Sequence, residues 1–339
     1  MSLGLLTPIT TLIASLAVLY IIHWLDIVER EPKKALITAF ISGIFTAALA
    51  LGFAEIASST WLIATGSREW VNFAGSVIDA PIIEELCKLV GLAAVVAICR
   101  KNINSLMDLV LYGSAVAIGF EFIENTLYQW HALQSTDAAQ AWIQEFNYRT
   151  IGTAGTHAFF SAWNGLAIWL VMSLKQSKVK KILCIVPILI AISLHSINNL
   201  SAFLANYGPA GELVQANYIG MLLGSINTSV SVAGFLALIG TALVLDLFSL
   251  SKLSIDLQKG LDNQRLEVLA NPFYHLLAHA SWSWKLAGET AAKEVQRKTF
   301  SQYARLAVEY HIPLTNKAGN TGEKKREILT RAYNLVKGQ

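Results

Sequence analysis

Carboxylate, imidazole and amide side chains recur within four successive apolar stretches of the chain. The catalytic candidates among them are Glu84, Glu85, Glu124, His157, His195 and Asn199. Residues three or four positions apart share one face of a helix, so His195 can point to the same side as Asn199. A carboxylate can take a proton from water, and imidazole or amide groups can hydrogen-bond an oxyanion. These residue types therefore indicate hydrolysis at an interior point that the four stretches share.

Ionisable side chains are expensive in lipid, so each one needs a structural or a functional reason. The structural interpretation pairs Glu84 with Lys88, one helical turn later, as a buried ion pair. It accounts for single residues, but a structural network does not need two carboxylates beside two imidazoles. We expect Lys88, Phe120 and Asn125 to support the site, because Phe120 lies one turn before Glu124 and Asn125 follows it directly.

The elements that must position these side chains are membrane helices. Of the 339 residues, 54% are hydrophobic and 14% are charged, against about 45–50% and about 25% in soluble domains, which excludes an ordinary soluble globule. A bilayer core about 30 Å thick needs roughly 20 apolar residues per helix. Seven stretches meet that length and predict an all-α, polytopic membrane helix bundle: Leu5–Leu25, Ala35–Ile56, Phe73–Ile98, Leu106–Trp130, Ala154–Leu174, Ile182–Leu204 and Tyr218–Leu247.

Basic residues are concentrated in alternate loops between these stretches. One side carries Arg30, Lys33, Lys34, Arg100, Lys101, Lys175, Lys178, Lys180 and Lys181, whereas the other carries only Arg68 and Arg149. The positive-inside rule then predicts an outside N-terminus and a cytoplasmic C-terminus, which an odd number of spans satisfies. No basic residue precedes the first apolar stretch, so we expect a retained helix rather than a removable signal. A prokaryotic plasma membrane fits a chain of this kind.

The last part of the chain differs in composition from the rest. Residues 1–250 hold 12 basic and 15 acidic residues, whereas residues 251–339 hold 14 and 8. Apolar residues recur at helical spacing in this tail, which predicts a small cytoplasmic helical domain beside the membrane. Its positive charge suits contact with anionic lipid headgroups. No motif in the chain indicates nucleic-acid binding.

The ordered motifs resemble those of the PrsW family of intramembrane proteases, which is grouped with the CAAX-processing and bacteriocin-processing membrane proteases. The similarity lies between about Asp79 and Asn199. It is carried by PIIEELCK at Pro81–Lys88, GFEFIEN at Gly119–Asn125, the pair Thr156 and His157, and HSINN at His195–Asn199. Each motif is weak alone, and their order makes the set more specific.

The resemblance implies an endopeptidase that cuts a membrane-anchored protein, and family members include a site-1 protease for an anti-sigma factor. Glu84 and Glu85 match the paired glutamates, one of which is expected to activate water. His195 and Asn199 match an HxxxN element that is expected to hold the oxyanion. Glu124 stands where the wider group often has the histidine of FxxxH. Lys88 comes one residue earlier than the arginine of EExxxR.

The same residues leave the role of a metal open. Two histidines and two glutamates can form a zinc site, with Glu84, Glu124, His157 and His195 as ligands. The chain has no HExxH motif, and we favour a glutamate mechanism without a cofactor. Two other classes of function also fit buried polar residues. One is a proton-coupled transporter or channel, and the other is a noncatalytic membrane scaffold.

Overall fold

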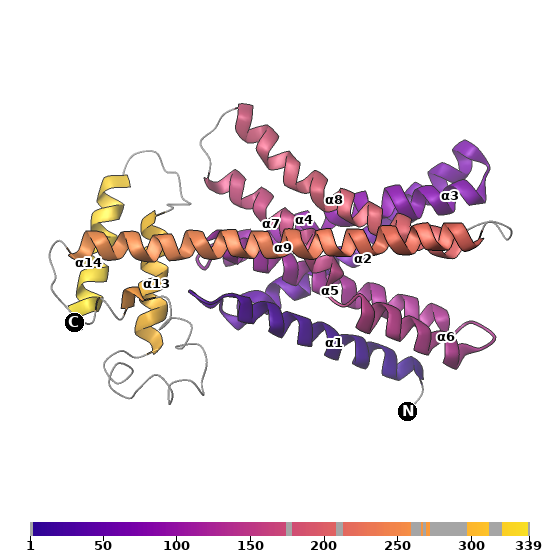
Figure 1. The fold of residues 1–339 in the computed structure, drawn as a ribbon, viewed down its shortest axis with the longest axis horizontal. Helices are drawn as coiled ribbons and strands as arrows, with labels where there is room; N and C mark the ends of the chain where they lie inside the picture. Colours follow the sequence, from indigo (N-terminus) through magenta and orange to yellow (C-terminus); the bar gives the residue numbers. More distant parts are fainter. Residues whose placement is uncertain are drawn as a thin grey trace.

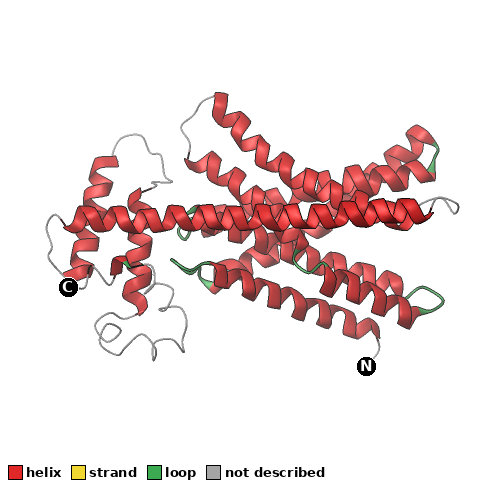
Figure 2. Ribbon diagram, in the orientation of Figure 1, coloured by secondary structure: helices red, strands yellow, loops and turns green. Residues whose placement is uncertain are grey.

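The computed structural model describes residues 3–173, 178–207, 213–258, 266, 269–271, 297–311 and 321–337. These residues form helices joined by short loops and contain no strand (Figure 2). The helices are α1 (Leu3–Leu25), α2 (Lys33–Thr65), α3 (Arg68–Ala74), α4 (Ala80–Cys99), α5 (Leu106–Ala132), α6 (Ala138–Glu145), α7 (Thr156–Ser173), α8 (Lys178–Tyr207), α9 (Leu213–Gln258), α13 (Arg297–His311) and α14 (Thr321–Lys337), with π-helical turns η1 (Gly75–Asp79) before α4 and η2 (Phe146–Gly152) before α7. The predicted all-α class is confirmed.

Five helices are long and apolar enough to cross a membrane: α1, α2, α5, the part of α8 from Ile182 to Ala205, and the part of α9 from Tyr218 to Gln258. The other two predicted spans form α4 and α7. Polar residues set these two helices apart, because α4 carries the three charged residues Glu84, Glu85 and Lys88, while α7 carries His157 and Asn164. A seven-span topology stays a prediction for these two helices.

Helix α5 is the central helix of the bundle. It packs against α1, α2, α4 and α7 (Figure 1), and every residue from Leu106 to Glu121 is buried. Glycines allow the neighbouring backbones to approach closely. A Cβ on Gly119 would lie 1.9 Å from the carbonyl oxygen of Phe40 in α2, and one on Gly165 of α7 would lie 2.3 Å from that of Leu109. Such small residues are typical of tightly packed membrane helices.

Helix α9 runs the length of the molecule, and α13 and α14 pack against its C-terminal end (Figure 1). Leu250 and Leu253 of α9 form an apolar cluster with Tyr303 of α13, Ile328 of α14 and Val28 from the loop after α1. The helix passes through residue 250 without a break. The division at that residue therefore marks a change in composition inside one helix, and the separate tail domain stays a prediction.

Candidate active site

Helix α4 brings a buried lysine to the centre of the site. The Nζ atom of Lys88 lies 2.9 Å from Oε1 of Glu85, 3.5 Å from Oε2 of Glu84 and 2.8 Å from Nδ1 of His157. The same ammonium group lies 4.2 Å from the centroid of the Phe120 ring. A buried charge is tolerated when it is paired and hydrogen-bonded. Lys88 thus satisfies groups on α4 and α7 at once.

Glu85 is fully buried and has partners for both of its carboxylate oxygens. Oε1 accepts from Lys88 and lies 3.2 Å from Nδ1 of His195 on α8. Oε2 accepts from Ser161 Oγ at 2.7 Å and from Asn164 Nδ2 at 3.1 Å, both on α7. Glu85 therefore links three helices, and its oxygens are committed to orienting those side chains.

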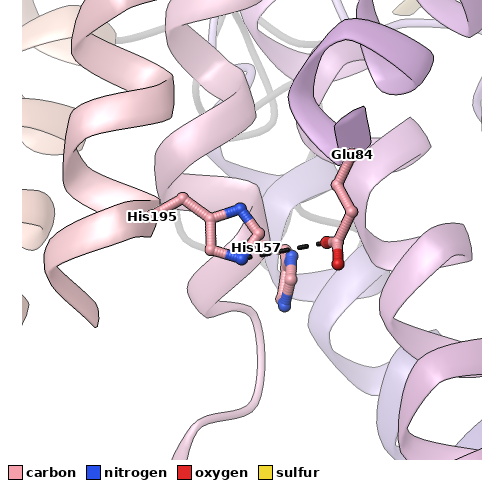
Figure 3. A group of neighbouring side chains, drawn as sticks. All are labelled: Glu84, His157 and His195. Carbon is pink, nitrogen blue, oxygen red and sulfur yellow. Dashed lines mark ion pairs between the residues drawn. The ribbon is translucent and has the colours of Figure 1, made fainter. Parts of the chain in front are cut away.

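Glu84, the adjacent residue, has a different environment. Besides Lys88, its Oε2 atom lies 3.8 Å from Nε2 of His195, and its side chain lines a cavity between α2, α4 and α5. Figure 3 shows Glu84, His157 and His195 converging from three helices, with their polar atoms directed toward one another. Of the two adjacent glutamates of α4, Glu84 is the one that lines this cavity.

A third glutamate, Glu124, lies on the far side of the His157 ring. Nε2 of His157 is 3.0 Å from Oε2 of Glu124, and Oε1 of Glu124 accepts from Arg149 at 3.1 Å. Phe120 stacks on the imidazole with a centroid distance of 6.0 Å. Arg149 belongs to η2, the π-helical turn that precedes α7. The negative charge of Glu124 is therefore balanced, and His157 is held between Lys88 and Glu124.

The start of α7 is fixed by a carboxylate from α5. The backbone N–H of Gly155 donates to Oε1 of Glu121 at 2.9 Å. Gly155 has a φ of 80°, a conformation that side-chain-bearing residues rarely adopt. Because His157 follows two residues later, Glu121 and Gly155 set the position of its ring.

Two of the predicted site residues bind backbone carbonyl groups instead of the catalytic side chains. Nδ2 of Asn199 donates to the carbonyl oxygen of Ser76 in η1 at 3.0 Å, so Asn199 ties α8 to the turn before α4. Nδ2 of Asn125 donates to the carbonyl oxygen of Arg149 at 3.4 Å. Among the described contacts, none joins either asparagine to Glu84, Glu85 or the histidines. An oxyanion role for Asn199 stays a prediction.

Three residues of the network are absent from the predicted site: Ser161, Asn164 and Arg149. A signal for the first two exists in the sequence, because His157, Ser161 and Asn164 are spaced by four and three residues and so share a helix face. Arg149 has no comparable signal. Its side chain reaches Glu124 only through the fold of η2 against α5.

The donor set also fits a metal ion. Glu84, His157 and His195 can each offer one ligand atom, and these atoms lie within 4.8 Å of one another. Two imidazoles and one carboxylate leave the fourth position of a tetrahedral zinc open, as in catalytic sites. Glu124, the fourth predicted ligand, is not in this group. Its contact with Nε2 of His157 would orient that ring and leave Nδ1, the atom beside Lys88, to bind the metal.

Five apolar helices and a buried cluster of carboxylates and imidazoles define an integral, multi-pass membrane protein with a hydrolase-like site. The model of the PrsW family intramembrane metalloproteases matches residues 31–251, more than half of the chain, and the chain belongs to this family. The match confirms the resemblance seen in the motifs. It also confirms that the chain belongs to the class of intramembrane peptidases, which act on membrane proteins in the bilayer. No curated protein and no solved structure matched the chain.

Proposed function

We propose that this protein is an intramembrane endopeptidase in which Glu84 activates the attacking water. The observation that carries the proposal is the contrast between two adjacent glutamates. Both oxygens of Glu85 are bound by buried partners, whereas Glu84 lines a cavity. A general base must reach water and substrate, and Glu84 meets this requirement.

In the proposed reaction, Glu84 takes a proton from water while the water oxygen attacks the carbonyl carbon of the scissile peptide. Lys88, 3.5 Å from Glu84, offsets the negative charge that moves onto the carbonyl oxygen. His195 is held by Glu85 at Nδ1 and directs Nε2 toward Glu84. When Nε2 carries a proton, it can donate to the oxyanion. Glu84 then passes its proton to the amine nitrogen as the C–N bond breaks, leaving a carboxylic acid and an amine.

Zinc is the alternative to this mechanism, and the description of the family as metalloproteases favours it. Glu84, His157 and His195 would hold the ion. Zinc would polarise the peptide carbonyl and lower the pKa of a bound water. In that case Glu85 and Glu124 would orient the two imidazoles through the contacts they already make.

The proposed substrate is a protein anchored by one membrane span, and an anti-sigma factor is one such protein. The proposed setting is a prokaryotic plasma membrane, with the N-terminus outside and the C-terminus in the cytoplasm. We further propose that the basic tail lies against anionic lipid headgroups, because positively charged segments beside a membrane are attracted to them. Nucleic acid has no part in this proposal.

The test is cleavage of a single-span reporter by the purified protein in lipid vesicles. Glu84→Gln keeps the shape of the side chain but removes the base, so we expect at least a roughly 100-fold loss of kcat/KM. Glu55→Gln is the matched control, because Glu55 is an exposed glutamate of α2, and it should cleave as the wild type does. Wild-type activity in Glu84→Gln would disprove the assigned base.

A further inference from the structure

A cavity of about 60 Å³ lies between α2, α4 and α5, directly beside the catalytic candidates. Its polar side chains are Glu84 and Glu124, and the rest of its lining is apolar. Binding pockets typically combine an apolar lining with a few convergent polar groups. The cavity therefore has the composition of a binding subsite in which an apolar group contacts the apolar lining and lies beside the two glutamates.

The shape of this cavity depends on alanines of α2. Ala47, Ala50 and Ala54 line it, and their spacing of three and four residues places them on one face of the helix. Large apolar residues occupy the opposite side of the same helix, where Phe45 and Leu49 are exposed toward lipid. The space beside the glutamates exists because side chains on the inner face of α2 are small.

The rim of the cavity reaches the outer surface of the bundle. Leu51 of α2 and Leu127 of α5 line the cavity, and they are 52% and 37% exposed. In a membrane, that surface faces lipid and the membrane-spanning segments of other proteins. A transmembrane segment can therefore present a side chain to the cavity from within the bilayer.

We infer that this cavity is the specificity pocket of the enzyme and receives an aliphatic side chain of the substrate, on a residue that flanks the scissile peptide bond. The inference rests on the proposed function. One water needs about 10–15 Å³ of such space, so the cavity of about 60 Å³ holds about four to six atoms of that size, which is enough for the side chain of valine or leucine. Acidic side chains are excluded because Glu84 and Glu124 lie on the wall.

Reporters that differ only at the residues flanking the cleavage site test this pocket. Wild-type protein should cleave leucine and valine reporters at least tenfold faster, in kcat/KM, than alanine and aspartate reporters. Ala50→Leu and Ala54→Leu fill the pocket from α2. Each should lower the leucine-to-alanine ratio at least tenfold, because a few methylene groups in an apolar pocket are worth this much discrimination.

Ala48→Leu is the matched control, because Ala48 lies on the same helix but is exposed, and its leucine-to-alanine ratio should equal that of the wild type. An unchanged ratio in both pocket variants would overturn the inference. So would an equal loss for all reporters in well-folded protein, which is the result expected if a lipid acyl chain fills the cavity.

A binding measurement separates this inference from the proposed chemistry. In a Glu84→Gln background with Cys87, Cys99 and Cys184 replaced, Ala54→Cys should form a disulfide with a reporter that carries cysteine beside the cleavage site, when an added thiol oxidant takes up the two electrons that the pair of thiols releases. Ala48→Cys should capture the same reporter at least tenfold less. Capture without any cleavage by wild-type protein would refute the proposed function and keep the pocket. Cleavage by wild-type protein with equal capture at both positions would refute the pocket alone.

Discussion

The ammonium nitrogen of Lys88 on α4 lies 2.8 Å from Nδ1 of His157 on α7. Lysine can only donate a hydrogen bond, so Nδ1 is the acceptor and the proton of the neutral ring is on Nε2. That atom faces Oε2 of Glu124 at 3.0 Å. One buried cation therefore fixes the tautomer of a histidine on another helix, while it also pairs with Glu85.

Lys88→Met should strongly destabilise the protein, because it leaves Glu85 buried without its cation. Removing one partner of a buried pair costs about 3–5 kcal/mol. The measurement starts from protein dissolved in a mild detergent and follows its unfolding as a denaturing detergent is added. Lys34→Met is the control, since Lys34 is exposed near the start of α2 and should change stability by less than about 0.5 kcal/mol. Equal stability of the two variants would contradict the pairing.

The adjacent glutamates should respond differently to the same substitution. Glu85→Gln leaves the buried Lys88 without its nearest anion and places an amide among donors from Ser161 and Asn164. We therefore expect a loss of about 3–5 kcal/mol in stability together with a loss of cleavage. Glu84→Gln should lose cleavage with a change in stability under about 1 kcal/mol. Detergent unfolding and reporter cleavage, measured on both variants, check the contrast. If Glu84→Gln were the less stable variant and Glu85→Gln kept its stability, Glu85 would be the base and Glu84 the structural residue.

Gly155→Ala should be destabilising, because the residue before α7 has a φ of 80°. A Cβ there would also lie 2.9 Å from Cγ1 of Val18. The strain costs about 1–3 kcal/mol, and displacement of His157 should lower kcat. Gly75→Ala is the control, since Gly75 has a helical φ of −59° and open space around a Cβ. Gly75→Ala should leave stability unchanged or slightly higher, and a tolerated Gly155→Ala would exclude strain at this turn.

Cleavage should survive chelation under the glutamate mechanism, because the ammonium of Lys88 already supplies positive charge beside Glu84 and His157. The measurement is reporter cleavage before and after treatment with a strong chelator, with metal analysis of the purified protein. Less than about 0.1 zinc per chain in active protein is the expected result. Two results together would establish the metal mechanism instead. The wild-type protein would contain one zinc per chain and His195→Ala would not, and added zinc alone would restore cleavage by the chelated wild-type protein.

The loop between α1 and α2 should make the stability of the protein depend on pH. Burial, and next the charge of Asp108, raise the pKa of Glu29 well above its usual range. Asp26 acts in the same direction, whereas Asn104 and Arg305 oppose it. The folded state therefore binds more protons than the unfolded state between the usual and the raised pKa. The free energy of unfolding must fall as pH rises through this interval.

Glu29→Gln removes this titration and should reduce the decrease in Tm as pH rises above the usual pKa of a glutamate. Glu69→Gln is the control, because Glu69 is an exposed residue of α3 and should leave the pH dependence of Tm as it is in the wild type. If Glu29→Gln had the same pH dependence as the wild type, Glu29 would not be the group responsible.

Much of the fold was predictable because its signals are local. A run of about 20 apolar residues requires a lipid environment whatever its neighbours do, and helical spacing places Glu84, Lys88 and His195 on interior faces. The spans at α4 and α7 were harder to define for the same reason that makes them functional. Helix α4 holds three charged residues, and α7 holds a histidine and an asparagine, which are rare within membrane spans.

The sequence by itself determined which residues could do chemistry and that they had to do it inside a membrane, because burying a charge in lipid is costly enough to make each one conspicuous. Only the tertiary structure decided which glutamate faces the cavity, since Glu84 and Glu85 are neighbours on one helix and their environments depend on how α2, α7 and α8 pack around it. The packing also joined Arg149 to Glu124 and tied Asn199 to Ser76. Such contacts link segments far apart in the chain, and no local pattern encodes them.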